Sequence, residues 1–311
     1  MIVVKELNHT HPKVGGVIVI YHPDESLLPA VIEATLSQVD FLYVVNNGDH
    51  PIQINTKKFR DQALIKKIET IENGQNLGIA TALNIGLKAL IDKGCSYFLM
   101  LDQDSLISEG MVLKLLKSLN VLNRQGLHVA AIGPTYFHSH LHKYAPFIQF
   151  GKLSLKKIQV ENDQQLVETH FLITSGTLVT LDALQNVGLM EDNLFIDFVD
   201  TEWCLRAVNM GYKLYGDSGA RMTHSLGDEP VTLLGRKFSM HSPLRHYYLV
   251  RNTVYLVKKA YIPLNSRFVI FVMTLKYFIF YSLIPSNRTE HFRKMLRGLK
   301  DGLNNNLGRY D

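Results

Sequence analysis

A short apolar run that ends in two carboxylates most constrains how this chain can fold. Residues 98–101 are Phe, Leu, Met and Leu, and Asp102-Gln103-Asp104 follow directly. The apolar run predicts a buried strand, which puts both aspartates at the carboxyl edge of a sheet, where open α/β folds bind ligands. Two hard oxygen donors at this spacing suit Mg²⁺ or Mn²⁺ bridging a nucleotide diphosphate. An aspartate-rich turn explains the tripeptide equally well, so the rest of the chain must decide.

The composition indicates a folded and basic protein. The chain has 311 residues, of which 46% are hydrophobic, so it can bury a large core and is not disordered. Cys95 and Cys204 both stand among apolar residues, which argues against a disulfide framework and fits a reducing cytosol. The first residues show no long apolar segment of the signal-peptide kind. The net charge of +5 favours anionic lipid, nucleic acid or phosphorylated ligands, and part of it is concentrated between residues 288 and 309.

Apolar periodicity predicts an α/β fold. Strands are expected at residues 14–21, 41–45, 65–71 and 96–101, and helices at residues 25–38 and 79–93. This β-α-β-β-α-β order predicts a Rossmann-like, mostly parallel central sheet with helices on both faces. Further helices are expected at residues 109–123, 182–187, 201–210 and 244–259. Further strands are expected at residues 129–133, 169–180 and 212–215, the second of them interrupted by Ser175-Gly176. Asp200 is placed as the N-cap of the helix at residues 201–210.

Polar and small residues follow the predicted elements of the N-terminal half. The first strand exits at Tyr21-His22-Pro23, the second exits at Asn46-Asn47-Gly48, and residues 76–86 read NLGIATALNIG. Small residues at a helix N-terminus let the backbone approach a ligand, and the helix dipole favours a diphosphate there. The strand exits are equally explained as plain turns, and the small residues as close packing of a helix on the sheet.

A second acidic cluster opens the helix expected at residues 201–210, where residues 195–206 read FIDFVDTEWCLR. Residues 245–252 read RHYYLVRN. Together with the strand exits, the NLGIATALNIG segment and Asp102-Gln103-Asp104, these motifs stand in the order found in the inverting glycosyltransferases of family 2. The chain resembles that family over residues 14–258, and within it the bacterial rhamnosyltransferases. The resemblance implies the GT-A fold.

The resemblance also implies roles for individual residues. It assigns donor binding to Tyr21, Asn46, Asn76, Gly78, Asn84, Asp102, Gln103 and Asp104. It assigns a divalent metal to Asp104 as the direct ligand, with Asp102 and His224 beside it. Aligned on Cys204-Leu205-Arg206, the catalytic base is Asp200, which would remove the proton of the acceptor hydroxyl. It assigns acceptor binding to Ser175, Gly176, Asp197, Glu202 and Trp203, and phosphate contacts to Arg245 or Arg251.

Simpler structural roles remain open for several of these residues. Relatives usually have Asp at the position of Asn46 and often an acidic residue at that of Val199, so the chain departs from the family pattern there. Asp200 could cap its helix only. Ser175-Gly176 could form a β-bulge, and His224 could be structural. Arg245 and Arg251 could lie on a water-facing helix.

These observations lead us to expect a metal-dependent inverting glycosyltransferase that uses Mg²⁺ or Mn²⁺. Its donor would be dTDP-rhamnose and its acceptor a hydroxyl of a cell-surface polysaccharide precursor, either a glycan or a polyprenyl-diphosphate-linked glycan. The same fold with a UDP-hexose donor is an alternative. A nucleotidyltransferase is another, although it usually carries a Gly-rich Lys/Arg loop after the first strand, where His22-Pro23-Asp24 stands here. The paired carboxylates argue against the third alternative, a basic nucleic-acid or membrane-binding module, and we expect no nucleic-acid partner.

The C-terminal part suggests contact with a membrane. We expect a catalytic GT-A domain at residues 1–235 and a C-terminal helical, membrane-associating region at residues 236–311. The apolar run at residues 268–284 is short for a bilayer span and contains Lys276, which would cost about 3 kcal/mol at the bilayer centre. An interfacial helix beside the basic segment explains the composition better, while a buried helix or a homo-oligomer contact stays open. We therefore expect a cytoplasmic enzyme, peripheral at the inner face of the cell membrane.

Overall fold

The structure is a computed structural model that describes residues 12–138, 143–160, 165–224, 230–233, 236–239 and 241–310. For residues 138, 224, 230–233 and 236–239 it describes the backbone alone. The predicted metal contact His224 therefore has its side chain outside the described part. The expected domain boundary, between residues 235 and 236, also falls at a residue outside the described ranges.

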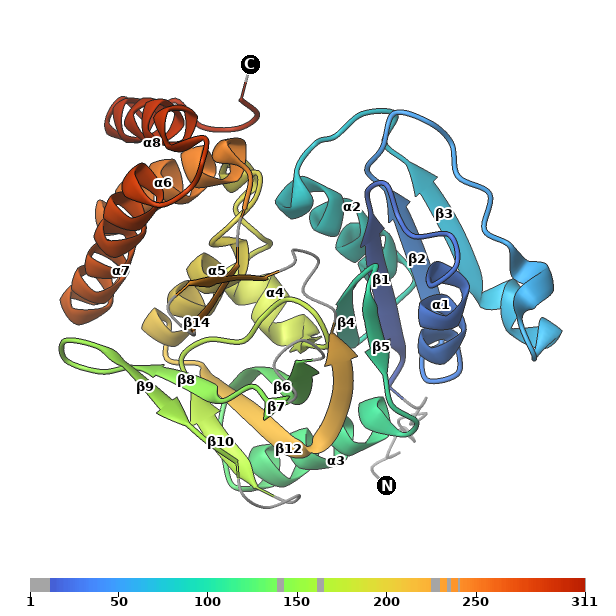
Figure 1. The fold of residues 1–311 in the computed structure, drawn as a ribbon. Helices are drawn as coiled ribbons and strands as arrows, with labels where there is room; N and C mark the ends of the chain where they lie inside the picture. Colours follow the sequence, from blue (N-terminus) through green and yellow to red (C-terminus); the bar gives the residue numbers. More distant parts are fainter. Residues whose placement is uncertain are drawn as a thin grey trace.

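The described residues form one ten-stranded sheet with a parallel half and a mixed half (Figure 1). The parallel half contains β3 (Ile68–Glu72), β2 (Phe41–Asn46), β1 (Val14–Ile20) and β4 (Tyr97–Asp102), in that spatial order. Ile20 pairs with Asn46 and Val19 pairs with Asp102, so three strands end at one edge. The predicted strand that ends in the aspartates is confirmed, as is the β-α-β-β-α-β order.

The mixed half continues the sheet beyond β4. It contains β11 (Leu178–Thr180), β6 (Val129–His138), β12 (Lys213–His224) and β10 (Leu166–Thr169), with β5 (Ser105–Ile107) on β12 and β7 (Lys143–Tyr144) on β6. The strand predicted at residues 169–180, with an interruption at Ser175-Gly176, is confirmed only at its two ends. Strand β10 ends at Thr169, β11 begins at Leu178, and the two pair with different neighbours. Gly176, with φ of +80°, turns the chain between them. The short hairpins β8 (Phe147–Phe150)–β9 (Leu155–Ile158) and β13 (Pro230–Leu233)–β14 (Arg236–Ser239) lie outside this sheet.

Helices cover both faces of the sheet, as expected. Val17 and Val19 of β1 point into a core shared with α2 (Ile79–Asp92), α4 (Leu181–Val187) and α5 (Val199–Asn209). Ile18 and Ile20 point into a second core, shared with α1 (Leu28–Leu36) and α3 (Met111–Arg124). The alternation of side chains along a strand explains why a wholly apolar β1 serves both cores. The structure also contains three short 3₁₀ helices: η1 (Thr56–Lys58) and η2 (Gln62–Lys67) between β2 and β3, and η3 (Asp192–Leu194) before α5.

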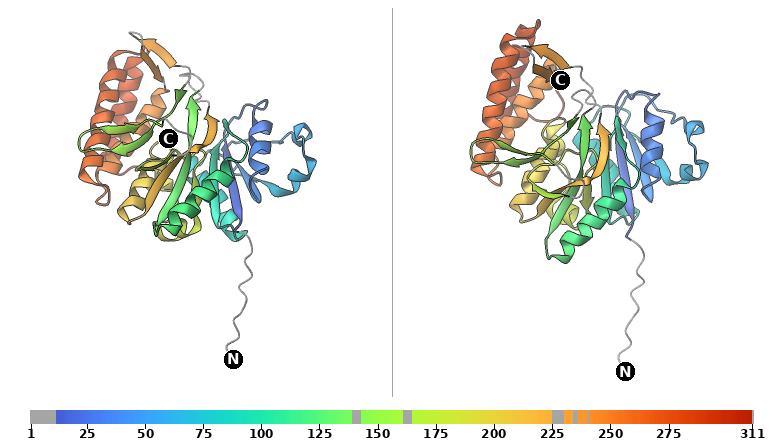
Figure 2. Two further views of the ribbon diagram at one scale, coloured as in Figure 1. Left: turned by 90° about the horizontal axis from the view of Figure 1, so that it is seen from below. Right: turned by 60° about the horizontal axis from the view of Figure 1, so that its bottom comes forward.

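Three further helices follow β14 and pack together at one side of the molecule, away from α1 (Figures 1 and 2). They are α6 (Pro243–Val257), α7 (Leu264–Leu283) and α8 (Arg288–Leu303). Ser242 caps α6, since its hydroxyl accepts from the N–H of Arg245. Asn252 of α6 donates to the carbonyls of Leu194, Ile196 and Asp197, so α6 holds the loop that precedes α5.

Candidate active site

The carboxyl edge of β1, β2 and β4 carries the first part of the site. The side chain of Gln103 joins β4 to the exit of β1, because its Oε1 accepts from the N–H of Tyr21 at 2.7 Å and its Nε2 donates to the Tyr21 carbonyl at 3.1 Å. A pocket of about 370 Å³, here called the first pocket, opens at this edge. Its lining includes Tyr21, Asn47, Asn76, Gly78, Asp102, Gln103, Asp104, Phe195 and Arg245.

A second pocket of the same volume adjoins the first. It is lined by Tyr136, Thr174, Asp197 and Asp200, and it shares Ile79, Asp102, Ile196 and Arg245 with the first pocket. The two acidic clusters of the sequence therefore meet, with Asp102 in the lining of both pockets and Asp200 in that of the second. Burial raises the pKa of Asp200 to about 6, and the negative charges of Asp102 and Asp197 add to the rise.

Asp200 does not cap its helix, so that prediction is wrong. Helix α5 begins at Val199, and the residue before it, Phe198, is left-handed with φ of +64°. Asp200 lies in the first turn, and its Oδ1 accepts from the N–H of Thr201 at 2.7 Å. Phe195 and Asp197 also have positive φ. Backbone strain of this kind persists only where neighbouring contacts fix it, and it is common at functional sites.

Gly78 fits this loop against α2. Its φ is +85°, and a Cβ there would stand 2.6 Å from Cδ2 of Phe195. The next N–H, that of Ile79, donates to the carbonyl of Phe195 at 2.7 Å. Gly78 thus allows α2 to pack closely on this loop, which is one of the two roles that the sequence left open. It also lines the first pocket.

An asparagine cluster shapes the other wall of the first pocket. Asn47 donates to Oδ1 of Asn76, and its own Oδ1 accepts from Asn73 and from the N–H of Leu77. Sequence reasoning chose Asn46 and passed over Asn47, although both stand at the same strand exit. Tyr136 was also missed, because it comes from a segment whose sequence shows no clear period. Thr174 was missed because the neighbouring Ser175-Gly176 was chosen instead.

Asp197 and Arg245 connect the loop to α6 at the boundary of the two pockets. Nε of Arg245 lies 3.1 Å from Oδ1 of Asp197. The other carboxylate oxygen, Oδ2, is buried and has no hydrogen-bond partner among the residues that the structure describes. Burial raises the pKa of Asp197, and the charge of Arg245 opposes that rise.

Several residues predicted for the site lie away from the pocket linings. Asn46 is buried, donates to the His50 carbonyl and to Glu72, and accepts from the N–H of Gly48. Ser175 is buried under β4, where its Oγ donates to Ser105 and accepts from the N–H of Asp102. Gly176 packs against Pro134 and Met222.

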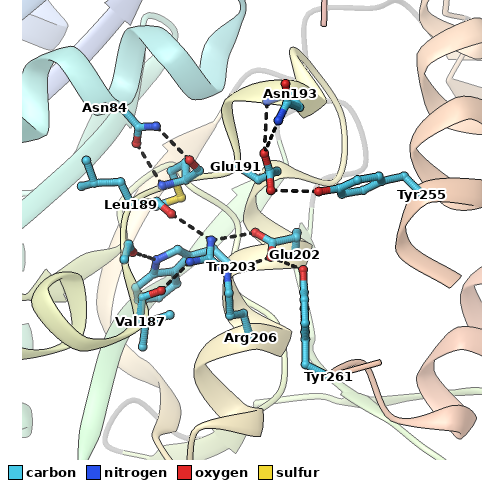
Figure 3. Close-up of polar contacts among 12 residues, drawn as sticks. Asn84, Val187, Leu189, Glu191, Asn193, Glu202, Trp203, Arg206, Tyr255 and Tyr261 are labelled. Atoms are coloured by element: carbon cyan, nitrogen blue, oxygen red, sulfur yellow. Dashed lines mark hydrogen bonds and ion pairs between the residues drawn. The ribbon is translucent and has the colours of Figure 1, made fainter. Parts of the chain in front are cut away.

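Four more predicted residues are structural in their contacts. Asn84 binds the backbone of Met190, and Trp203 donates to the carbonyl of Gly188 (Figure 3). Nδ2 of Asn84 also donates to Oδ1 of Asp192. Glu202 is buried and makes a bidentate ion pair with Arg206 at 2.8 Å (Figure 3). Arg251 is buried too, and its guanidinium binds backbone carbonyls and lies over the rings of Tyr247 and Tyr248.

The donor set suits a divalent cation that is completed by a ligand. Within the described ranges, no group of three or more His, Cys, Asp or Glu side chains gathers into a metal site. Asp102 and Asp104 both line the first pocket. Magnesium-type ions are commonly held by one or two carboxylates together with substrate phosphates and water, so these two residues fit such an ion.

Comparison with known proteins adds independent findings. A family model described as "Glycosyl transferase family 2" matches residues 16–188. The "dTDP-rhamnosyl transferase RfbF" of Shigella flexneri is 32% identical over 289 residues, which cover 93% of this chain and 94% of that protein.

Solved structures share the fold at low identity. The crystal structure of GalNAc-T7 with UDP, GalNAc and Mn²⁺ aligns with a TM-score of 0.55 and 11% identity over 94% of this chain, which spans 56% of that chain. The S. aureus TarS 1–349 complex with UDP-GlcNAc aligns with a TM-score of 0.53 and 11% identity over 93% of this chain and 81% of that chain. These likenesses support the expected GT-A-like architecture.

Proposed function

The chain belongs to glycosyltransferase family 2, and from this membership we propose that it transfers L-rhamnose from dTDP-rhamnose to a hydroxyl of a cell-surface polysaccharide precursor. The donor is proposed from the Shigella flexneri relative, which is a dTDP-rhamnosyl transferase and aligns over nearly the whole chain. The observation that carries the chemistry is the meeting of Asp102 and Asp200 at two adjoining pockets.

We propose that the first pocket holds the nucleotide diphosphate and the second holds the acceptor. Tyr21, Asn47 and Asn76 line the part of the first pocket nearest the exits of β1 and β2, so they are placed to contact the nucleoside. Asn47 replaces Asn46 in this proposed contact, because the Asn46 side chain is bonded within the protein. Arg245 lines both pockets and would attract the diphosphate.

The proposed reaction is a single displacement. The acceptor oxygen forms a bond to the anomeric carbon of rhamnose while the bond from that carbon to the diphosphate oxygen breaks, and dTDP leaves. Asp200 takes the proton of the attacking hydroxyl. A pKa near 6 leaves Asp200 largely ionised at neutral pH yet basic enough to accept that proton. Inversion at the anomeric carbon needs no covalent intermediate on the protein.

A divalent ion fits this proposal as an aid to the leaving group. Asp102 and Asp104 would hold Mg²⁺ or Mn²⁺, which supplies positive charge for the departing diphosphate. Neighbouring Gln103 fixes the segment through its two bonds with Tyr21. We further propose a cytoplasmic enzyme that works at the inner face of the membrane, where a polyprenyl-linked acceptor would present its glycan.

A donor panel tests this function. Purified protein is incubated with a glycan acceptor and dTDP-rhamnose, UDP-glucose or UDP-GlcNAc, with Mn²⁺ or with EDTA, and the released nucleotide is measured. We expect dTDP release with dTDP-rhamnose, its loss in EDTA and its recovery on addition of Mn²⁺. Turnover of a UDP-hexose alone would overturn the donor, and full activity in EDTA would overturn the metal. In a parallel incubation with dTTP and a sugar 1-phosphate, release of pyrophosphate would indicate a nucleotidyltransferase instead.

A further inference from the structure

Helix α7 carries an apolar stripe that the fold leaves uncovered. Its members recur every three or four residues along the whole helix, and each is between 46% and 77% exposed: Leu264, Phe268, Phe271, Leu275, Ile279 and Leu283. Side chains at this spacing lie on one side of a helix. The other side packs on the protein through buried Val269, Ile270 and Tyr281, and the hydroxyls of Thr274 and Thr253 are 2.7 Å apart. The stripe therefore faces away from the body of the molecule.

Helix α8 carries a second stripe of the same kind. Phe292, Leu296, Leu299 and Leu303 recur at helical spacing and are between 39% and 60% exposed. Gly298 and Gly302, which directly precede two of these residues, pack closely on α6. A Cβ added at either glycine would lie less than 3 Å from an atom of α6. This contact prevents α8 from rotating to bury its stripe. The α8 stripe lies close to α7, because Phe292 contacts Phe278 of that helix with ring centroids 5.9 Å apart.

A row of cations borders the α8 stripe. Arg293, Arg297 and Lys300 each follow a stripe residue, which puts them about 100° further round the helix, and all three are exposed. Arg288 is exposed at the start of the same helix, and Lys276 is exposed on α7. Glu290 is the one exposed carboxylate within α8, a helix that is described in full, because Asp301 is buried beneath Arg297. The combined surface is thus apolar with a positive edge.

We infer that this surface, made of the two stripes and their bordering cations and here called the apolar–basic face, binds the surface of an anionic lipid bilayer. Helices with an exposed apolar side and Lys or Arg beside it lie in the plane of a membrane interface, and each cation near anionic headgroups adds to the binding. The apolar side chains would enter the headgroup boundary, while the cations would contact lipid phosphates.

Two other arrangements fit the contacts less well. Helix α7 is long and apolar enough to cross a membrane by length and composition, with 28% of it buried in the protein. A crossing would nevertheless detach its Thr274 contact with α6 and place Lys276 in the hydrocarbon. A second copy docked on this face would bring together two surfaces that both carry an excess of positive charge, which is unfavourable.

Vesicle binding tests the inference. The full-length protein is sedimented with vesicles of phosphatidylcholine alone or mixed with phosphatidylglycerol, at low and high salt. We expect the protein to bind the vesicles that contain phosphatidylglycerol, and we expect this binding to weaken at high salt. F271E/L275E should reduce it about tenfold or more, and R293E/K300E should reduce it roughly fivefold for each cation removed.

Matched variants and a second measurement keep the test decisive. Leu113 of α3 is 56% exposed and Lys57 is an exposed cation of η1. The single variants L113E and K57E make the same kinds of change elsewhere and should leave binding unchanged. Circular dichroism of each variant checks its fold. The inference is overturned if wild type ignores the mixed vesicles, if both vesicle types bind equally at all salt concentrations, or if sedimentation equilibrium shows a dimer that F271E/L275E separates while vesicle binding is absent. None of these outcomes depends on the identity of the sugar donor.

Discussion

At the scale of single residues, the behaviour of Asp200 follows from where its carboxylate is placed. Burial disfavours its ionised form, and Asp102 and Asp197 repel the charge, so the pKa rises from 3.8 to about 6. The N–H of Thr201 opposes the rise by donating to Oδ1. The same environment that makes this carboxylate a useful base at neutral pH therefore makes it costly for the folded protein.

The proposed base gives a pH profile with a definite direction. Because Asp200 must be ionised to accept a proton, kcat/KM should fall about tenfold per pH unit below pH 6 and level off above it. Initial rates between pH 4.5 and 8, with the fold checked by circular dichroism at each pH, measure this. A rate that is constant from pH 5 to 7 would exclude a base with the pKa that burial gives Asp200.

Replacement of Asp200 should also change stability. The folded state binds this proton more tightly than the unfolded chain, so between pH 4 and 6 the free energy of unfolding falls as pH rises. D200N removes that cost and should stabilise the protein at pH 7.5 by on the order of 1–3 kcal/mol, with little gain at pH 4. Thermal melts of wild type and D200N at both pH values provide the measurement. A lower Tm for D200N at pH 7.5 would contradict the account.

At the scale of elements, the site depends on how α2, α5 and α6 hold the loop between them. Asn252 of α6 binds three carbonyls of this loop, and Ile79 at the start of α2 binds a fourth. Glu202 of α5 pairs with Arg206 and accepts from the hydroxyl of Tyr261 at 2.5 Å, which joins α5 to the segment between α6 and α7 (Figure 3). Asn252, Glu202 and Tyr261 thus help to position Asp200, although none of the three lines either pocket.

Gly78→Ala should disturb this arrangement. Alanine at φ of +85° is strained, and its Cβ would clash with Phe195, so we expect a loss of about 2–4 kcal/mol in stability together with reduced activity. Gly74 is the matched control, since its φ is +67° but nothing lies within 4 Å of an added Cβ. G74A should cost about 1 kcal/mol. Urea unfolding of both variants measures these losses of stability. Equal losses in G78A and G74A would show that the clash with Phe195 does not affect stability.

The buried ion pair of α5 should matter for stability. Glu202→Ala leaves the half-buried guanidinium of Arg206 without its carboxylate, and we expect a loss of about 3–5 kcal/mol. Glu69, which pairs with Lys93 at the surface, is the control, and E69A should cost no more than about 1 kcal/mol. Both values come from chemical denaturation. If E202A unfolded at the same denaturant concentration as E69A, the network would have no structural role.

At the scale of the whole molecule, the N-terminal half could be predicted from the sequence because its signals are local. Apolar strands and amphipathic helices alternate there, and the carboxyl edge of a parallel sheet follows from that order. In the mixed half, the strands expected at residues 129–133 and 212–215 are confirmed as parts of β6 and β12. The order of the strands could not be predicted, since β11 has three residues and its neighbours come from distant parts of the chain.

The same division applies to the site. Residues that directly follow a strand, such as Tyr21 and Asp104, lie where the sequence indicated. Glu202, Trp203 and Asn84 belong to the expected helices, but their side chains make structural contacts. These contacts are with the segment between α6 and α7, the end of α4 and the loop at Met190, respectively. Residue spacing along the chain predicts that a helix forms, but the packing of whole elements decides which side of that helix faces the pocket.

The most direct test of the central claim, that the two acidic clusters form one active site, combines transfer and binding in D200N. We expect its rhamnosyl transfer rate at saturating substrates to fall about a thousandfold or more. Its affinity for dTDP and Mn²⁺, measured by calorimetry, should stay within about threefold of wild type, since Asp102 and Asp104 are unchanged. Transfer by D200N at close to the wild-type rate would contradict the account.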